Sequence, residues 1–278
     1  MPSFCMALLL GTPFCYSQNR TVGLLEASPE AFEAYTLVSS FDQSGVYLVN
    51  NCGEVINFWD TDRPTGLATY VMNNSNLLTT YVINDGSFDR PGKGGGLEIR
   101  DWDNQILWDA QFTRGRFGAH HDIEPLPNNN ILVLLWEELS REEGIALGRR
   151  PENLGGPLWP EAIFEIRPIL GTSDFDVVWE WHLTDHIVQD VIPNETFGNP
   201  EDHPELVDLS ILTRFEDDWI HANAIDHNEA RDELILSTLH FNEFSIIDHS
   251  TTTAEAASHE GGNRGKGGDL LYLSLIHI

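Results

Sequence analysis

An Asn-rich turn that leads into an apolar strand occurs twice in the chain and constrains its fold more than any other feature. The turn reads Met72-Asn-Asn-Ser-Asn-Leu-Leu78 and, 54 residues later, Leu126-Pro-Asn-Asn-Asn-Ile-Leu132. Runs of β-forming residues that begin with Glu and end in Trp accompany these turns, at 54–59, 98–108 and 165–181. A unit of about 50 residues with short strands, a turn and a recurrent tryptophan is typical of a β-propeller blade. We therefore expect an all-β propeller, with about four blades in this chain.

The fourth unit contains a histidine at a position that repeats. It runs from Trp219 through 233–236 to 244–248, and its turn at Asn228 aligns with Asn128. This alignment places His221 on His121, each seven residues before its turn. The first unit has Leu67 there, so the fold itself does not demand histidine, which favours a functional role for the pair.

Two segments interrupt the repeat. Residues 139–154 are expected to form one short helix, and 185–215 form a long acidic insertion that contains proline. Long insertions in a compact fold often line a binding site. Both lie near histidine motifs in the sequence, so we expect them beside the site.

The charge of the chain excludes several classes of partner. Forty-four acidic and 15 basic residues give a formal net charge of -29, a field that repels phosphate backbones and anionic lipid headgroups. We therefore expect no nucleic-acid and no membrane partner. The hydrophobic fraction of 41% is large enough for a folded core, which argues against disorder.

The N-terminal residues 1–18 read as a secretory signal peptide. An apolar stretch from Phe4 to Leu10 precedes Gly11, Pro13 and small residues, and it is too short to span a membrane. The mature protein is then expected to be secreted or periplasmic. Removal of this segment leaves Cys52 as the one cysteine, expected as a buried small hydrophobic residue.

The C-terminal residues have an unusual composition. Residues 273–278, Leu-Ser-Leu-Ile-His-Ile, look like the translation of a sequencing adaptor, so we interpret them as a non-native tail. The propeller is then expected over 19–272, with the natural chain continuing beyond Tyr272 and further blades missing.

Histidine is the residue type that could carry chemistry in this chain. Strand alternation predicts that His221, Asn223 and Ile225 share one face, with two alanines on the other. If the repeats are blades, the histidines lie at similar heights near the central channel. We expect the catalytic residues to be His121, His221 and His120, and the substrate-binding residues to be Asn223, His182, His186 and His240.

Three chemistries suit such a set. In sulfuryl or phosphoryl transfer, one imidazole attacks, a second protonates the leaving oxygen, and cations stabilise the equatorial oxygens. A metal site would use ligands with short spacings, namely His120, Asp122, His182, Asp185 and His186. Binding without catalysis is the third. The first hypothesis requires no metal and no cofactor.

Several motifs together resemble the secreted bacterial arylsulfotransferases. They cover nearly all of the expected mature chain: Asn19-Arg-Thr-Val-Gly-Leu-Leu25, Asn51-Cys-Gly-Glu54, Ile99-Arg-Asp-Trp-Asp103, His120-His-Asp-Ile123 with Leu126-Pro-Asn128, Trp179-Glu-Trp-His182, Asp218-Trp-Ile-His-Ala-Asn223 and Asp248-His-Ser-Thr-Thr-Thr253. The resemblance implies a six-bladed propeller. It also implies nucleotide-independent transfer of a sulfuryl group from an aryl sulfate donor to a phenolic acceptor, through a sulfated histidine.

The resemblance also marks two departures. It implies that His221 and one of His120 or His121 assist the transfer, while the nucleophilic histidine lies in a later motif, so this chain alone is expected to be inactive. It implies an arginine after the strand that follows Trp-x-His, where this chain has Leu239. Two alternatives therefore stay open. One is a ligand-binding propeller without catalysis, and the other is a metal-dependent hydrolase built on His182, Asp185 and His186.

Overall fold

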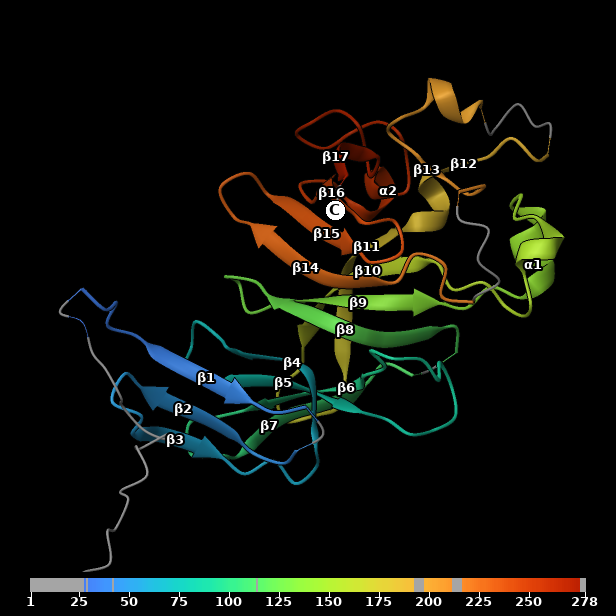
Figure 1. Ribbon diagram of the computed structural model, residues 1–278. Coiled ribbons are helices and arrows are strands. Elements are labelled where there is room, and N and C mark those ends of the chain that lie inside the picture. The colour runs from blue at the N-terminus through green and yellow to red at the C-terminus, as the bar shows by residue number, and fades with distance from the viewer. Residues whose placement is uncertain are drawn as a thin grey trace, which may run out of the picture.

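Four antiparallel sheets make up most of the structure (Figure 1). The computed structural model describes residues 28, 30–41, 43–113, 115–192, 198–211 and 217–275, so the expected signal peptide lies outside the described residues. The first sheet has three strands: β1 (Tyr35–Ser39), β2 (Val46–Asn50) and β3 (Val55–Trp59). The second has four: β4 (Thr65–Val71), β5 (Leu77–Val82), β6 (Gly95–Arg100) and β7 (Ile106–Gln111).

The other two large sheets also have four strands. The third consists of β8 (Phe117–Pro125), β9 (Ile131–Glu137), β10 (Glu161–Pro168) and β11 (Phe175–His182). The fourth consists of β14 (Ala222–Asn228), β15 (Glu233–Thr238), β16 (Glu243–Asp248) and β17 (Leu270–Leu275). In every sheet each strand pairs with the next one along the chain, which is the meander of a propeller blade.

The first strands of the sheets meet at the centre of the arrangement. β8 contacts both β4 and β14, and β1 contacts β4. Sheets whose first strands contact one another in this way are blades around a common axis. The expected all-β propeller is therefore confirmed, with four blade sheets in the described residues. The expected number of six blades in the full-length family stays a prediction.

The Asn-rich turns connect the first and second strands of their blades. Ser75 and Asn129 occupy the same position in two successive turns and have φ of 68° and 67°. In each turn an asparagine side chain, that of Asn74 or Asn128, accepts the backbone N–H two residues later. Asparagine suits these turns because its side chain caps the local backbone.

The recurrent tryptophans tie each blade to the next. They lie buried in the last strand of a blade, and each indole N–H donates to the connection between the third and fourth strands of the following blade. In chain order the bonds are Trp59 to the Asp101 carbonyl at 2.8 Å, Trp108 to the Asp174 carbonyl at 2.8 Å, and Trp179 to the Thr251 hydroxyl at 3.1 Å. The tryptophan that recurs in the sequence therefore forms a hydrogen bond between neighbouring blades.

Both interruptions of the repeat have short elements of their own. The first contains α1 (Arg141–Ala146), which begins at a capping box formed by Ser140 and Glu143, and η1 (Pro151–Asn153). The second contains η2 (Leu183–His186), β12 (Ile187–Val188), η3 (Pro200–Asp202) and β13 (Val207–Asp208), where β12 and β13 pair in parallel. A last helix, α2 (Thr253–Ala256), precedes β17.

Cys52 differs from its sequence interpretation, whereas the non-native origin of the expected tail stays a prediction. Cys52 is exposed in the turn between β2 and β3, so the prediction of a buried side chain was wrong. Its backbone N–H bonds to the Asn50 side chain, and the residue lies in an exposed turn. Residues 273–275 of the expected tail form part of β17 and pair with β16, whereas 276–278 lie outside the described residues.

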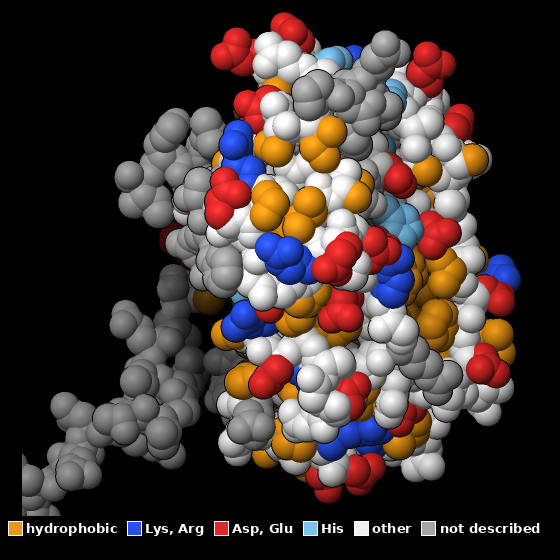
Figure 2. Space-filling view, turned by 90° about the vertical axis from the view of Figure 1, so that its right-hand side faces the viewer, with side chains coloured by type: hydrophobic (Ala, Val, Ile, Leu, Met, Phe, Trp, Pro, Cys, Tyr) orange, Lys and Arg blue, Asp and Glu red, His pale blue; other side chains and the backbone are white. Residues whose placement is uncertain are grey.

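Acidic side chains are dispersed over the face shown in Figure 2, interspersed with basic and hydrophobic ones. This matches the spread of acidic residues along the sequence. None of the helices in the described residues combines the length and the apolar character that a membrane crossing requires.

The inter-blade bonds predict a specific loss of stability in Trp108→Phe. The change removes the N–H donor to Asp174 and part of a buried ring, so the free energy of unfolding should fall by about 1–3 kcal/mol. Urea denaturation followed by far-UV circular dichroism measures it. Trp102, which is 43% exposed, is the matched control, and its change to Phe should cost less than about 0.5 kcal/mol. Equal losses in both variants would contradict the bridging role.

Candidate functional site

A β-bulge interrupts the first strand in each of the three four-stranded blades. The pairing shifts between Thr65 and Thr69 in β4, between residues 119 and 123 in β8, and between 222 and 224 in β14. His121 lies within the bulge of β8, His221 stands one residue before that of β14, and Leu67 lies in that of β4. Bulges re-aim side chains and are over-represented beside functional sites.

The two aligned histidines share an uncommon backbone conformation. His121 has φ of 48° and His221 has φ of 55°, which lie in the left-handed region that few non-glycine residues adopt. Their ring centroids are 4.6 Å apart, at an interplanar angle of 78°. His240 joins them with its ring centroid 5.1 Å from that of His221, and its Nδ1 lies 3.2 Å from the Trp219 carbonyl. The alignment within the sequence thus identified two histidines whose rings are in contact in the structure.

His120 lies behind His121 and binds a buried carboxyl group that the sequence did not reveal. Its Nε2 is 2.9 Å from Oε2 of Glu161, and both side chains are fully buried. The ring stacks on Trp136, with centroids 4.0 Å apart and planes at 6°. Glu161 also accepts the backbone N–H of Ala222 from β14 at 2.8 Å, which joins the third blade to the fourth.

Burial makes the neutral forms of this pair the stable ones. It raises the pKa of Glu161 well above its usual range and lowers the pKa of His120 to about 3. A neutral Glu161 carboxyl donates its O–H to Nε2 of His120, which leaves the ring N–H on Nδ1. That atom lies 3.0 Å from Nδ1 of His121, which must then accept. His121 therefore carries its own N–H on Nε2.

Asp218 fixes the orientation of His221 through a hydrogen bond to its Nδ1 atom. Burial opposes ionisation of Asp218, but the hydrogen bond and charge of His221 outweigh it and lower the Asp218 pKa. The carboxylate accepts from Nδ1 of His221 and, at 3.0 Å, from Nε1 of Trp136. This hydrogen bond holds a proton on Nδ1 of His221. Asp218, three residues before His221, was quoted only as part of a motif in the sequence.

The cluster therefore contains a neutral imidazole, His121, in contact with a second imidazole, His221, that is hydrogen-bonded to a carboxylate. Two imidazoles in such different environments can act as acid and base in general acid–base catalysis. Burial and the neighbouring imidazoles lower the pKa of His121 to about 3, so it stays neutral at physiological pH. The pair can give a proton to one oxygen and take one from another.

Gly92 fixes His121 from the adjacent loop. Its carbonyl accepts the His121 backbone N–H at 2.7 Å, and its own φ is 90°. A Cβ at this position would lie 1.8 Å from the His121 ring, so the close approach requires glycine. The same loop carries Arg90, which pairs with Asp217, and Lys93.

Two other predicted site residues have different surroundings. His182 bonds to Glu137 at 2.9 Å and packs against Phe117 and Phe164, at the outer strand of its blade. His186 bonds to Asp269 at 2.8 Å. The structure does not bring either of them into contact with the central histidines.

Asn223 and the proposed metal ligands also depart from the sequence interpretation. The bulge breaks the expected alternation, because Ala222 is fully buried while Ala224 is exposed, and Asn223 is the extra half-buried residue between them. Asp122 bonds to the Tyr70 hydroxyl and to the Ile225 backbone N–H. Among the described residues, the possible metal-binding groups are others: His186 with His259 and Asp269, and His227 with Asp232 and His249.

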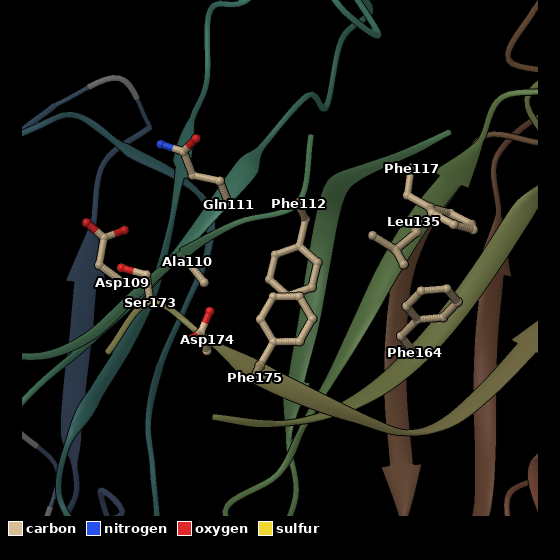
Figure 3. A pocket seen from close by; sticks show the side chains of 10 residues that line it. All are labelled: Asp109, Ala110, Gln111, Phe112, Phe117, Leu135, Phe164, Ser173, Asp174 and Phe175. Carbon is tan, nitrogen blue, oxygen red and sulfur yellow. The ribbon is translucent and has the colours of Figure 1, made fainter. Parts of the chain in front are cut away.

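A separate cavity lies between β7 of the second blade and the strands of the third blade (Figure 3). It has a volume of about 500 Å³, and Phe112 and Phe175 stack in it with ring centroids 4.5 Å apart. Phe117 and Phe164 lie across from them in the figure, and Asp109 and Asp174 lie at the other end. The histidine pair does not line this cavity.

Comparison with known proteins gives similar solved structures but no matching sequence. No family model matches it, and no curated protein matches its sequence. The structure of hydrazine synthase from Kuenenia stuttgartiensis is similar, with 10% identity over 89% of this chain and 60% of that one, at a TM-score of 0.47. The β-propeller domain of Cps50 (Swd1) from Myceliophteria thermophila has 11% identity over 88% and 61%, at 0.40. The chain thus spans about three fifths of both, and at these TM-scores neither likeness carries a functional argument.

The buried neutral histidines predict an acid-sensitive contribution to stability. Folded His121 binds a proton only near pH 3, whereas the unfolded chain binds it near the ordinary pKa of 6.5. The unfolded state therefore holds more protons between these values, and stability is lost as the pH falls through this window. His121→Asn, which tolerates the positive φ, should gain stability relative to the wild type between pH 6.5 and 4. Urea denaturation at stepped pH measures the difference, and parallel curves would contradict the buried neutral state.

Proposed function

We propose that the histidine cluster is the transfer site of an aryl-sulfate sulfotransferase, which moves a sulfuryl group from a phenolic sulfate ester to a phenol without a nucleotide. The observation that carries this proposal is the pair of His121 and His221, at aligned positions of neighbouring blades, with ring centroids 4.6 Å apart and Asp218 bound to His221. The motifs that resemble the arylsulfotransferases supply the substrate class. Secretion or a periplasmic location belongs to the same proposal.

The chemistry requires one proton donor and one proton acceptor at the sulfur. When the S–O bond of the donor ester breaks, the leaving phenoxide oxygen takes the Nε2 proton of His121. When the acceptor phenol attacks, its hydroxyl proton passes to Nε2 of His221, whose imidazolium Asp218 stabilises. The sulfated histidine implied by the resemblance forms its S–N bond as the ester S–O bond breaks, and this S–N bond breaks as the phenol oxygen bonds to sulfur. Return of the proton from His221 to His121, whose rings are in contact, restores the starting state and closes the cycle.

Glu161 and His120 act as positioning residues in this scheme. Neither touches the substrate directly, but their hydrogen bonds set the tautomer of His121. Once His121 has given up its Nε2 proton, the chain from Glu161 through His120 can supply a proton to Nδ1. A buried carboxyl group with a raised pKa suits this relay because it holds a proton near neutral pH.

The negative sulfuryl oxygens need cationic donors, and the cluster is poor in them. The backbone N–H of Leu239 bonds to the His221 carbonyl at 3.0 Å, so the residue that replaces the expected arginine lies directly beside the cluster. Its side chain is 50% exposed. Arg90 and Lys93, from the loop that holds His121, are the cations that this chain offers nearby, each with an acidic partner.

The rival function is a ligand-binding propeller that kept the histidines without catalysis. It shares the geometry of the cluster and differs in turnover alone, so kinetics separates the two. A metal-dependent hydrolase would have to use His182 and His186, whose side chains bind different carboxylates in separate places.

Replacement of His221 by Asn tests the proposed function. Asn tolerates the positive φ but provides no base, so turnover of 4-nitrophenyl sulfate with phenol as acceptor should fall about 100-fold or more in the full-length protein. The melting temperature should change little. His203→Asn, which alters a half-exposed histidine bound to Glu205, should keep full activity. If His221→Asn keeps its turnover, or if the wild type has none, the proposal fails.

A gain of function is expected from Leu239→Arg. The exposed position accepts the longer side chain, and a guanidinium beside His221 would add a donor to the sulfuryl oxygens, worth about 10-fold or more in turnover. The same substrate pair measures it. Leu239→Met, which is similar in length and neutral, is the control and should leave the rate unchanged. Equal rates in both variants would show that the expected arginine position does not reach the sulfuryl group.

A further inference from the structure

A second cluster of histidine and carboxylate lies away from the proposed transfer site, where the long insertion meets the last strands. His186 ends η2, His259 follows α2, and Asp269 directly precedes β17. Nδ1 of His186 and Nδ1 of His259 are each 2.8 Å from the same Oδ1 atom of Asp269. All three atoms lie within 4.8 Å of one another. Segments from three places in the chain thus converge on one point.

The hydrogen bonds of His186 indicate that a cation can lie between His186 and Asp269. Its Nε2 is 2.7 Å from the Ala256 carbonyl oxygen, which can only accept, so the ring N–H must be on Nε2. In the neutral ring Nδ1 then has a lone pair, and that lone pair faces an Asp269 oxygen that also only accepts. A cation between the two atoms resolves this conflict. A histidine that donates its other N–H to a backbone carbonyl is the usual arrangement of a metal ligand.

The surroundings hold the His186 ring in one orientation. His186 is completely buried and stacks on Trp181 with the planes at 4°. Trp181 donates its indole N–H to the Gly268 carbonyl at 2.8 Å. A Cβ on Gly268 would lie 2.6 Å from His186 Nε2, so the chain passes close to the ring only because this residue is glycine. A ligand fixed by its neighbours needs little reorganisation to bind a metal.

The third ligand leaves the site accessible. The His259 side chain is 60% exposed, while the Asp269 side chain is only 4% exposed. A metal ion can therefore enter past His259, and water can complete its coordination on that side. Two imidazole nitrogens and one carboxylate oxygen are a ligand set that Zn²⁺ accepts.

We propose that His186, His259 and Asp269 bind one Zn²⁺ ion, with water as the remaining ligand. Tetrahedral zinc with ligands at about 2.0–2.2 Å separates neighbouring donor atoms by roughly 3.3 Å, which lies between the 2.8 Å contacts and the 4.8 Å limit of this group. The ion links the insertion to the segment between α2 and β17, so its binding should stabilise the folded chain. It takes no part in the proposed transfer.

Metal binding to protein stripped with EDTA tests the proposal in the full-length chain. Calorimetric titration with ZnCl₂ should give one equivalent more for the wild type than for His259→Ala. Saturating zinc should also raise the melting temperature of the wild type by about 4 °C or more. In His259→Ala this increase should disappear, while the melting temperature without zinc stays unchanged because the side chain is exposed.

His203→Ala is the matched control, because His203 is a half-exposed histidine of the same insertion that pairs with Glu205. It should retain the wild-type stoichiometry and the zinc-dependent increase in melting temperature. The opposing interpretation is a protonated His186 that donates to both Asp269 and Ala256. Equal zinc stoichiometry in the wild type and His259→Ala, or no zinc bound at micromolar concentrations, would establish that interpretation and overturn the metal site.

Discussion

The central part of the structure depends on two carboxyl groups that cross the interface between the third and fourth blades. Glu161 accepts the backbone N–H of Ala222, and Asp122 accepts that of Ile225. These N–H groups lie on either side of the β14 bulge, where the regular pairing with β15 is shifted. Buried backbone donors must find acceptors, so the neighbouring blade supplies them. Without these carboxyl groups the bulge that sets the height of His221 would lose its support.

The periodic features of the chain were predictable from its sequence because each blade is built from the same local rules. Asparagine marked the turns since it caps the local backbone, and the recurrent tryptophan marked the last strand since it must bond to the next blade. Alignment of Asn128 with Asn228 then sufficed to pair His121 with His221. Residues that align within an internal repeat occupy equivalent positions in the fold, which is why this pair was found without a structure.

The partners of the histidines were beyond sequence reasoning because they come from distant segments. Glu161 lies 41 residues from His120, and no local pattern distinguishes it from the other acidic residues. The alternation rule failed at Asn223 because it assumes an unbroken strand, and the bulge inserts one residue there. His186 was grouped with His182 by spacing alone. In the structure His182 ends β11 and bonds to Glu137, whereas His186 ends η2 and bonds to Asp269.

Charge decides between transfer and binding at the histidine cluster. The chain has a net charge of -29. Burial keeps His121 neutral, whereas Asp218 close to it is ionised. An anionic sulfate ester approaching Asp218 is repelled unless a cation compensates. Desolvation strengthens this repulsion, since opposing and like charges both act more strongly away from water. The same histidine geometry therefore supports rapid sulfuryl transfer only where a basic side chain reaches the sulfur, and in this chain Arg90, Lys93 and the residue at position 239 determine whether one does.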